Sequence, residues 1–442
     1  MSKNNIKIFD WKVFFALLLF FFVVLVNPRD FPVKNLPLIY PAFVVYTATI
    51  GLQRIIEGFK RTFFLILILF IYWAYFTGLY VVKGNTLTLG RFAYLIEPIL
   101  IFIAAGAATS RPGGTTAAIW ALVSAITLST LGGLWIYFIG EPVATWRSIL
   151  HSSVGGSLIT GEFIRDIDLK EDLAMLVVRN TGLSYYIFLF SYQLAAAIFV
   201  VLATLVTLKG KFFGKKRLVL LCSLIVLILG MITNTERATV LSVSSGLLFY
   251  FIFKGIRIFN LRRISMFIFS VFLVVFIFNY TSNKLVERYS IYSRSFNEEK
   301  IFIRAYMSIP AIATLLYEPF GAGGMSKSYE SIAYQVGWLA PYGPEAPHNH
   351  FANVIMYTGI VGIVLIFLLF KGIFKRMKMS KTPPEVIVSC LCLTLIIHSL
   401  THNAGFFSYE PTTEIAFGLL WGVTSYKKDK VTRTRLYHGE KT

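Results

Sequence analysis

The sequence predicts an all-α polytopic membrane protein of about twelve transmembrane helices. Of its residues 56% are hydrophobic and only 14% are charged, whereas soluble proteins carry about 25% charged residues. The apolar residues also come in runs of about 17–25, the length that crosses a bilayer core of about 30 Å as a helix. Both observations exclude a soluble globular protein.

The predicted spans follow one another along the whole chain, so residues 1–442 are expected to form a single transmembrane domain. The first span follows Lys3 and Lys7 and has no small-residue cleavage site after it, which indicates an uncleaved helix. The spans are 11–26, 36–52, 62–82, 92–109, 117–139, 181–208, 218–233, 238–253, 264–280, 351–370, 384–401 and 412–426. Two long connections remain, 140–180 and 281–350.

The orientation follows from the basic residues, which collect on the cytoplasmic side of membrane proteins. Basic clusters such as 209–217 and 371–381 alternate with loops that hold most of the acids. Both termini are therefore expected in the cytoplasm, and both long loops on the outside. The net charge of +20 is then a topology signal, and no nucleic-acid partner is expected.

The first long loop, 140–180, has mixed charges, and it forms either a solvated lid or a helix on the membrane surface. The second, 281–350, is expected to hold the catalytic residues. Within it Lys300, Arg304 and Ser308 fall on one face of an apolar segment, which predicts an interfacial helix with Arg304 on the wet side.

Histidines are the first candidates for chemistry. His348 lies just before a predicted span and is either a general base or a solvated loop residue. The pairs His348/His350 and His398/His402 lack a nearby Cys or a carboxylate at a familiar metal-site spacing, so no metal is expected. For His398 the sequence favours hydrogen bonding between helices.

Gly321-Ala-Gly-Gly-Met-Ser-Lys327-Ser328 has some likeness to a phosphate loop. It lacks the glycine that such loops place directly before the lysine. It is also expected on the side of the membrane where nucleoside triphosphates are absent. We interpret it as a close-packed turn.

Charged residues at the outer ends of spans are the second group of candidates. Arg237 follows a very short turn and is either an interfacial anchor or an anion binder. With Arg304 and His348 on the same side, two guanidinium groups would suit a diphosphate. Glu97 lies inside the fourth span, about six residues from Arg91. A carboxylate at that depth is paired or functional.

These features together resemble the bacterial O-antigen ligase and O-antigen polymerase family. The resemblance covers the whole topology, and at residue level it covers 231–370. It is carried by the short arginine turn, the Arg304 segment, Pro319-Phe-Gly-Ala-Gly323, Pro347-His-Asn-His-Phe351 and Gly359-Ile-Val-Gly362.

The resemblance implies a membrane glycosyltransferase of the bacterial inner membrane with a GT-C-like fold. Its donor is a glycan on undecaprenyl pyrophosphate, its acceptor is a glycan or lipid A core, and it needs no cofactor. His348 matches the proposed base, and Arg237 and Arg304 match the pyrophosphate-binding arginines. Asn349, His350, Glu97 and Arg91 are secondary candidates. Glu236 departs from the family pattern, because it sets a negative charge beside Arg237.

Three functions remain open at this stage. A polymerase is preferred, because the sizeable loop 140–180 is able to hold a second lipid-linked glycan, and a chain-length regulator protein is then a candidate partner. A ligase that transfers to lipid A core is the alternative within the family. A polysaccharide transporter or flippase is the alternative outside it, although most charges lie at helix ends and no internal repeat is evident.

Overall fold

The computed structural model describes residues 9–26, 37–84, 86, 90–111, 113–139, 182–184, 187–208, 214–234, 236–253, 308–323 and 348–423. The regular elements in these ranges are α-helices. They are α1 (Trp11–Val26), α2 (Ile39–Ile50), α3 (Leu52–Val82), α4 (Gly90–Ala108), α5 (Gly114–Ile139), α9 (Ile187–Thr207), α10 (Lys215–Asn234), α11 (Arg237–Phe253), α14 (Ser308–Tyr317), α16 (His350–Met379) and α17 (Pro383–Ser399), followed by a helix over 411–423.

A helix covers every predicted span except 264–280, which lies outside the described residues. Within the described residues, five helices are long and apolar enough to cross a membrane: α3, α5, α9, α10 and α16. The other helices at predicted spans are shorter and apolar. The all-helical membrane fold is thus confirmed, while the count of twelve spans and the orientation stay predictions. Residues 140–180 are outside the described part of the chain, and so is most of 281–350.

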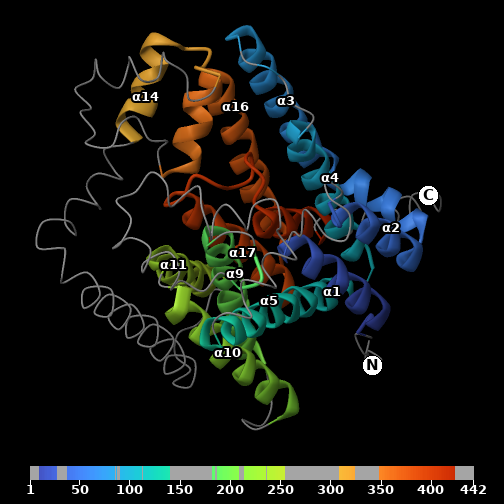
Figure 1. Ribbon diagram of the computed structural model, residues 1–442. Coiled ribbons are helices and arrows are strands. Elements are labelled where there is room, and N and C mark those ends of the chain that lie inside the picture. The colour runs from blue at the N-terminus through green and yellow to red at the C-terminus, as the bar shows by residue number, and fades with distance from the viewer. Residues whose placement is uncertain are drawn as a thin grey trace, which may run out of the picture.

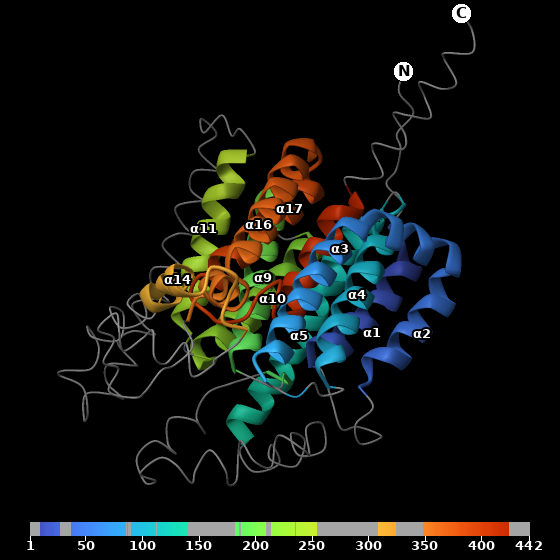
Figure 2. The same ribbon diagram turned by 90° about the horizontal axis from the view of Figure 1, so that it is seen from above.

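Helix α9 lies at the centre of one half of the bundle, where it packs against α5, α10, α11 and α17 (Figures 1 and 2). Its side chains are buried nearly all round, which suits a helix that is apolar on every face. Ala195, Ala196 and Ala197 are fully buried in it, and such small side chains let neighbouring helices approach closely. The other half is built from α1 to α4, with α3 packed along α4.

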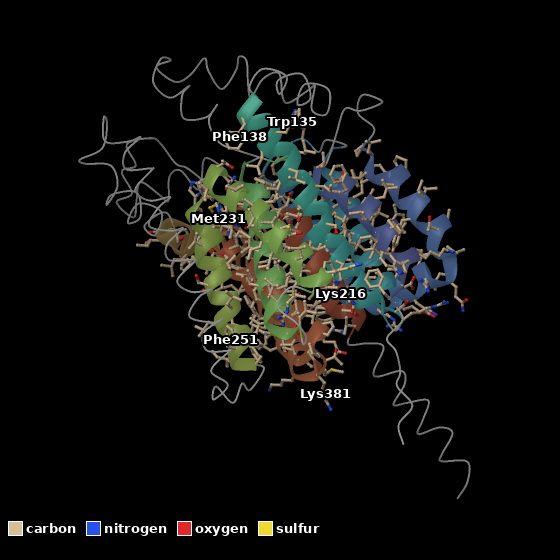
Figure 3. The ribbon with its side chains drawn as sticks, turned by 90° about the horizontal axis from the view of Figure 1, so that it is seen from below. Trp135, Phe138, Lys216, Met231, Phe251 and Lys381 are labelled. Atoms are coloured by element: carbon tan, nitrogen blue, oxygen red, sulfur yellow. The ribbon has the colours of Figure 1, made fainter. Side chains whose placement is uncertain are left out.

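Two lysines of the predicted cytoplasmic side lie toward one end of the bundle. Lys216 at the start of α10 and Lys381 between α16 and α17 lie toward one end, near Phe251 of α11 (Figure 3). Met231 of α10 and Phe138 of α5 lie toward the opposite end (Figure 3). Lys216 and Lys381 belong to the basic clusters 209–217 and 371–381, so one residue of each cluster lies toward the same end.

Helix α16 is bent sharply at Gly359, where φ is 58°. In a straight helix Phe351 and Phe370 would be about 28 Å apart, since each residue adds 1.5 Å. Their ring centroids are 5.5 Å apart, so the segments before and after the bend converge. The predicted span over 351–370 is thus helical but not straight.

The bend is where two sequence motifs meet. The amide of Ile360 donates to the Pro319 carbonyl at 2.9 Å, directly beyond the bend. The amide of Ala322 donates to the Met356 carbonyl at 2.9 Å, just before it. A Cβ on Gly359 would overlap the Pro319 carbonyl oxygen. The Pro-Phe-Gly-Ala-Gly turn is therefore seated in the bend and is close-packed over 321–323, while 324–328 of the predicted turn lie outside the described residues.

Helix α3 extends well beyond the loop over residues 400–410. Tyr72 in the middle of α3 contacts Phe407 of this loop, with ring centroids 4.7 Å apart. From there α3 continues for about ten residues, or about 15 Å, to its end at Val82. Just past that end the Lys83 ammonium lies 2.5 Å from the Glu318 carboxylate. The 400–410 loop is thus recessed relative to the end of α3.

Glu410 directly precedes the final helix, which spans 411–423. Its carboxylate accepts hydrogen bonds from the Thr412 amide at 3.2 Å and from the Thr413 amide and hydroxyl at 2.6 Å each. An acid at this position satisfies amides that the helix leaves unpaired. Burial raises the pKa of the Glu410 carboxyl to about 7, because the charged form loses its hydration, and these hydrogen bonds partly offset the shift.

Substituting Gly359 by alanine is expected to destabilise the fold. The side chain would strain a backbone conformation that L-residues rarely adopt and would displace Pro319 from the bend. We expect the free energy of unfolding to fall by about 2–4 kcal/mol, seen as a lower apparent Tm in detergent. Gly78→Ala in α3 is the matched control, since its Cβ meets no atom within 4 Å. Equal apparent Tm values for the two variants would contradict the role of the bend.

Glu410→Gln is expected to flatten the dependence of stability on pH. The folded state keeps the Glu410 proton up to about pH 7, whereas the unfolded state releases it near pH 4.5. Stability in the wild type therefore falls as pH rises between these values, by about 3 kcal/mol, and levels off above them. Glutamine removes this contribution. Apparent Tm values between pH 4.5 and 8 test it, and parallel curves for the two proteins would refute it.

Candidate functional site

The His348 segment is fixed by a helix cap. Asn349 has extended backbone angles and precedes the first residue of α16. Its side-chain oxygen accepts from the amides of Phe351 at 3.1 Å and Ala352 at 3.2 Å. Asparagine is among the preferred residues for this position, because it satisfies amides that the helix leaves unpaired. His348 is thereby held directly before the helix, in a half-buried position.

His350 ties this segment to the 400–410 loop, which is red in Figure 1. Its Nε2 accepts from the Phe407 amide at 3.2 Å, and its Nδ1 lies 3.2 Å from the Ser408 hydroxyl. Because Nε2 is an acceptor, a neutral ring carries its hydrogen on Nδ1 and donates it to Ser408. The ring is 1% exposed. A Cβ on Gly405 would overlap it, so the loop needs glycine there.

His398 joins three helices in the same region. Its Nε2 is 2.9 Å from the Ser191 hydroxyl of α9, and its Nδ1 is 3.0 Å from the Ser242 hydroxyl of α11. The edge of its ring meets Tyr192, with centroids 4.1 Å apart. The predicted hydrogen bonding between helices is confirmed.

His402 reaches the start of α11. Its Nε2 lies 3.6 Å from a carboxylate oxygen of Glu236, and both side chains are buried. Glu236 directly precedes Arg237, the first residue of α11. An acid before a helix is favourable, because the helix dipole is positive at that end. The 400–410 loop therefore contacts the Arg237 segment through His402, and the His348 segment through its contact with His350.

Acidic side chains gather beside this loop. Glu97 in α4, Glu410 and Glu414 in the final helix are all buried, and the charges of Glu97 and Glu410 both act on Glu414. Within the described residues neither carboxylate oxygen of Glu414 has a hydrogen-bond partner. In the same part of the chain, no group of three or more His, Cys, Asp or Glu side chains is arranged to hold a metal.

The structure describes only some of the predicted site residues. His348, Asn349, His350 and Glu97 are described, and the two secondary candidates Asn349 and His350 act on the position of the His348 segment. Arg237 and Arg91 lie in α11 and α4, but their side chains are outside the described part. Arg304 is outside it altogether.

Sequence reasoning missed the 400–410 loop. His402, Glu410 and Glu414 lie at the facing ends of the last two predicted spans, and ionisable residues there are a signal of function in a membrane protein. That signal was present, but nothing in the sequence indicates that this loop meets both the His348 and the Arg237 segments.

Comparison with known proteins adds an independent finding. A search of curated proteins gives no match. The family model described as O-antigen ligase matches residues 222–367, which include Arg237, Arg304 and His348. The match confirms the resemblance seen over 231–370: residues 222–367 of this chain are similar to the O-antigen ligase family.

Proposed function

We propose that this membrane protein is a glycosyltransferase that moves a glycan from undecaprenyl pyrophosphate to an acceptor hydroxyl, as a polymerase of O-antigen or another surface polysaccharide. The family match supports the class of enzyme. One observation carries the proposal further: the 400–410 loop contacts the segment of His348, at His350, and the segment of Arg237, at Glu236. A candidate base and a candidate phosphate-binding residue are thus attached to one loop.

In this proposal Arg237 and Arg304 bind the pyrophosphate of the donor. Pyrophosphate is already a good leaving group, so the reaction needs positive charge held where negative charge develops. A guanidinium suits this purpose, because its planar fork binds phosphate oxygens bidentately and stays charged. Arg237 at the start of α11 would also share the positive end of that helix with the anion.

His348 acts as the general base. Its imidazole accepts the proton of the acceptor hydroxyl while the acceptor oxygen bonds to the anomeric carbon. The bond from that carbon to the phosphate oxygen breaks, and its electron pair leaves with the pyrophosphate. The carbon passes through an oxocarbenium-like state, and attack opposite the leaving group inverts its configuration. The energy lies in the donor's phosphate linkage, so neither nucleotide nor cofactor is required.

The reaction is placed at the outer face of the bacterial inner membrane, with both termini in the cytoplasm. The gathering of Lys216 and Lys381 at one end of the bundle supports this orientation (Figure 3). The start of α11 follows the end of α10, whose other end carries Lys216, and the bend of α16 returns the His348 segment to the level of Phe407. A lipid-linked donor would reach this recess with its phosphates, while its prenyl chain lies among the membrane lipids.

A ligase acting on lipid A core is the alternative. The polymerase is preferred only because the loop 140–180 is long enough to help hold a second lipid-linked glycan. A transporter fits less well, since the buried histidines that the structure describes make fixed contacts between helices and loops. A chain-length regulator protein would be a partner of the polymerase alone.

Purified full-length protein in liposomes is expected to convert undecaprenyl-pyrophosphate-linked repeat units into a ladder of longer glycans, with chelator present and without nucleotide. A ladder is expected because each product is again a lipid-linked donor or acceptor. Gel electrophoresis of labelled glycan measures the product lengths. A single product on added lipid A core would mean a ligase. No transfer with either acceptor over several repeat-unit structures would overturn the proposed enzyme class.

His348→Ala is expected to reduce the transfer rate by about 10²–10⁴-fold, the usual contribution of a general base. The initial rate of glycan transfer at saturating donor measures this, with the apparent Tm as the check on folding. His438→Ala, in the C-terminal tail, is the matched control and should transfer at the wild-type rate. A folded His348→Ala protein as active as the control would eliminate this base.

A further inference from the structure

The 400–410 loop presents an exposed hydroxyl beside the His348 segment. Ser408 is exposed, although the preceding Phe407 is buried. The Ser408 oxygen lies 3.2 Å from Nδ1 of His350, which follows His348 by two residues. Two residues of chain span at most about 7 Å. The Ser408 hydroxyl therefore lies close to the segment that carries the candidate base.

The hydrogen bonds around Ser408 decide what its hydroxyl is able to do. A serine hydroxyl has one hydrogen to donate and two lone pairs that accept. The Gly405 amide donates to the Ser408 oxygen at 3.1 Å. Nδ1 of a neutral His350 carries the ring hydrogen, because Nε2 accepts from the Phe407 amide. The Ser408 hydroxyl therefore accepts from its surroundings and cannot donate to the histidine ring.

The hydrogen of the Ser408 hydroxyl is held only weakly within the protein. The Asn403 carbonyl oxygen is 3.4 Å from the Ser408 oxygen, longer than the usual distance of about 2.5–3.0 Å for such a bond. The same carbonyl also takes part in a hydrogen bond with His350. Among the described residues no other acceptor is within reach of this hydrogen. An exposed oxygen that is filled with donors is thus poised to donate to a ligand.

The charge of the loop favours a neutral ligand. Residues 400–410 include no lysine or arginine, and they include one acid, Glu410, two residues after Ser408. A phosphate would need a cation or several unbonded amides, whereas the amides of Gly405 and Phe407 are already bonded. The oxygen of a sugar hydroxyl needs only a donor.

Aromatic rings continue from the loop toward the end of α3. Phe407 contacts Tyr72. Phe76 lies one turn further along α3, with ring centroids 5.9 Å from Tyr72 and 5.4 Å from Tyr357 of α16. Phe76 and Tyr357 are partly exposed. Ligand sites combine apolar rings with a few polar groups, and a sugar offers both apolar C–H faces and hydroxyls.

Resting on the proposed role of His348 as the base, we propose that Ser408 binds the acceptor sugar. Its hydroxyl donates to a hydroxyl oxygen of the sugar that attacks, beside the attacking hydroxyl, and so holds the attacking hydroxyl near His348. His350 and the Gly405 amide fix the Ser408 oxygen for this purpose. The ligand is a neutral saccharide, and Ser408 exchanges no proton with it.

Glycan transfer by the full-length protein tests this role. The donor is saturating undecaprenyl-pyrophosphate-linked repeat unit. The acceptor is the same repeat unit on a labelled alkyl chain, which lacks pyrophosphate and therefore accepts without donating; lipid A core replaces it if the wild type transfers only there. Ser408→Ala should raise the KM for acceptor about fivefold, the usual worth of one hydrogen bond, and leave the KM for donor unchanged. Ser408→Thr keeps a hydroxyl and should restore the KM for acceptor.

Acceptors that each lack one sugar hydroxyl separate contact with the substrate from a merely structural role. Removal of the hydroxyl that Ser408 contacts should lower kcat/KM of the wild type about fivefold and that of Ser408→Ala no further. A distorted loop would instead lower kcat for every acceptor alike. Ser244→Ala is the matched control and should behave as wild type, since the half-buried Ser244 hydroxyl bonds the Val240 carbonyl of its own helix.

Each outcome bears on one hypothesis. An unchanged KM for acceptor in Ser408→Ala, or equal losses in wild type and variant for every altered acceptor, overturns the role of Ser408 while the proposed function stands. A wild type that transfers to no acceptor overturns the proposed function. Binding of the alkyl-linked glycan in detergent then decides on Ser408: binding about fivefold weaker in Ser408→Ala supports it, and equal binding refutes it. If Ser408→Ala has a lowered apparent Tm, Ser408→Cys, of similar size but a weak donor, takes its place.

Discussion

The hydrogen bonds between His350 and the 400–410 loop are the contacts on which the candidate site depends. A polar ring buried among apolar helices needs partners within the protein, because water is excluded there. The Phe407 amide and the Ser408 hydroxyl supply them. The ring in turn fixes the start of α16 against the loop, and the Asn349 cap fixes His348 against that start. The contacts of Asn349 and His350 thus help to place His348, the candidate base.

The bend at Gly359 explains how His348 comes to this loop at all. A straight α16 would hold Phe351 about 28 Å from Phe370. Instead the chain turns at a residue with no side chain, and the turn around Pro319 fills the bend. The segment before the bend then converges on the later part of the helix, which returns His350 to the level of Tyr72 and Phe407. The recess of the site follows from helix lengths and this one glycine.

The sequence was sufficient for the helices, because apolar runs of membrane length leave little choice of structure. It also predicted that His398 forms hydrogen bonds between helices. It singled out the motifs around Pro319 and Gly359, but it did not indicate that they touch. What it could not predict were contacts between distant segments. The pairing of His402 with Glu236, and of His350 with Phe407, depends on how helices pack. Periodicity and hydropathy carry no information about that packing.

The two histidine contacts join one loop to both candidate segments. His350 accepts from the Phe407 amide and so holds the segment of His348, the candidate base. His402 lies 3.6 Å from Glu236, which directly precedes Arg237, the candidate pyrophosphate-binding residue. Since both contacts lie in one short loop, a displacement of the loop would move both segments together. The proposed base and the proposed anion site are thus coupled through the backbone of residues 402–408.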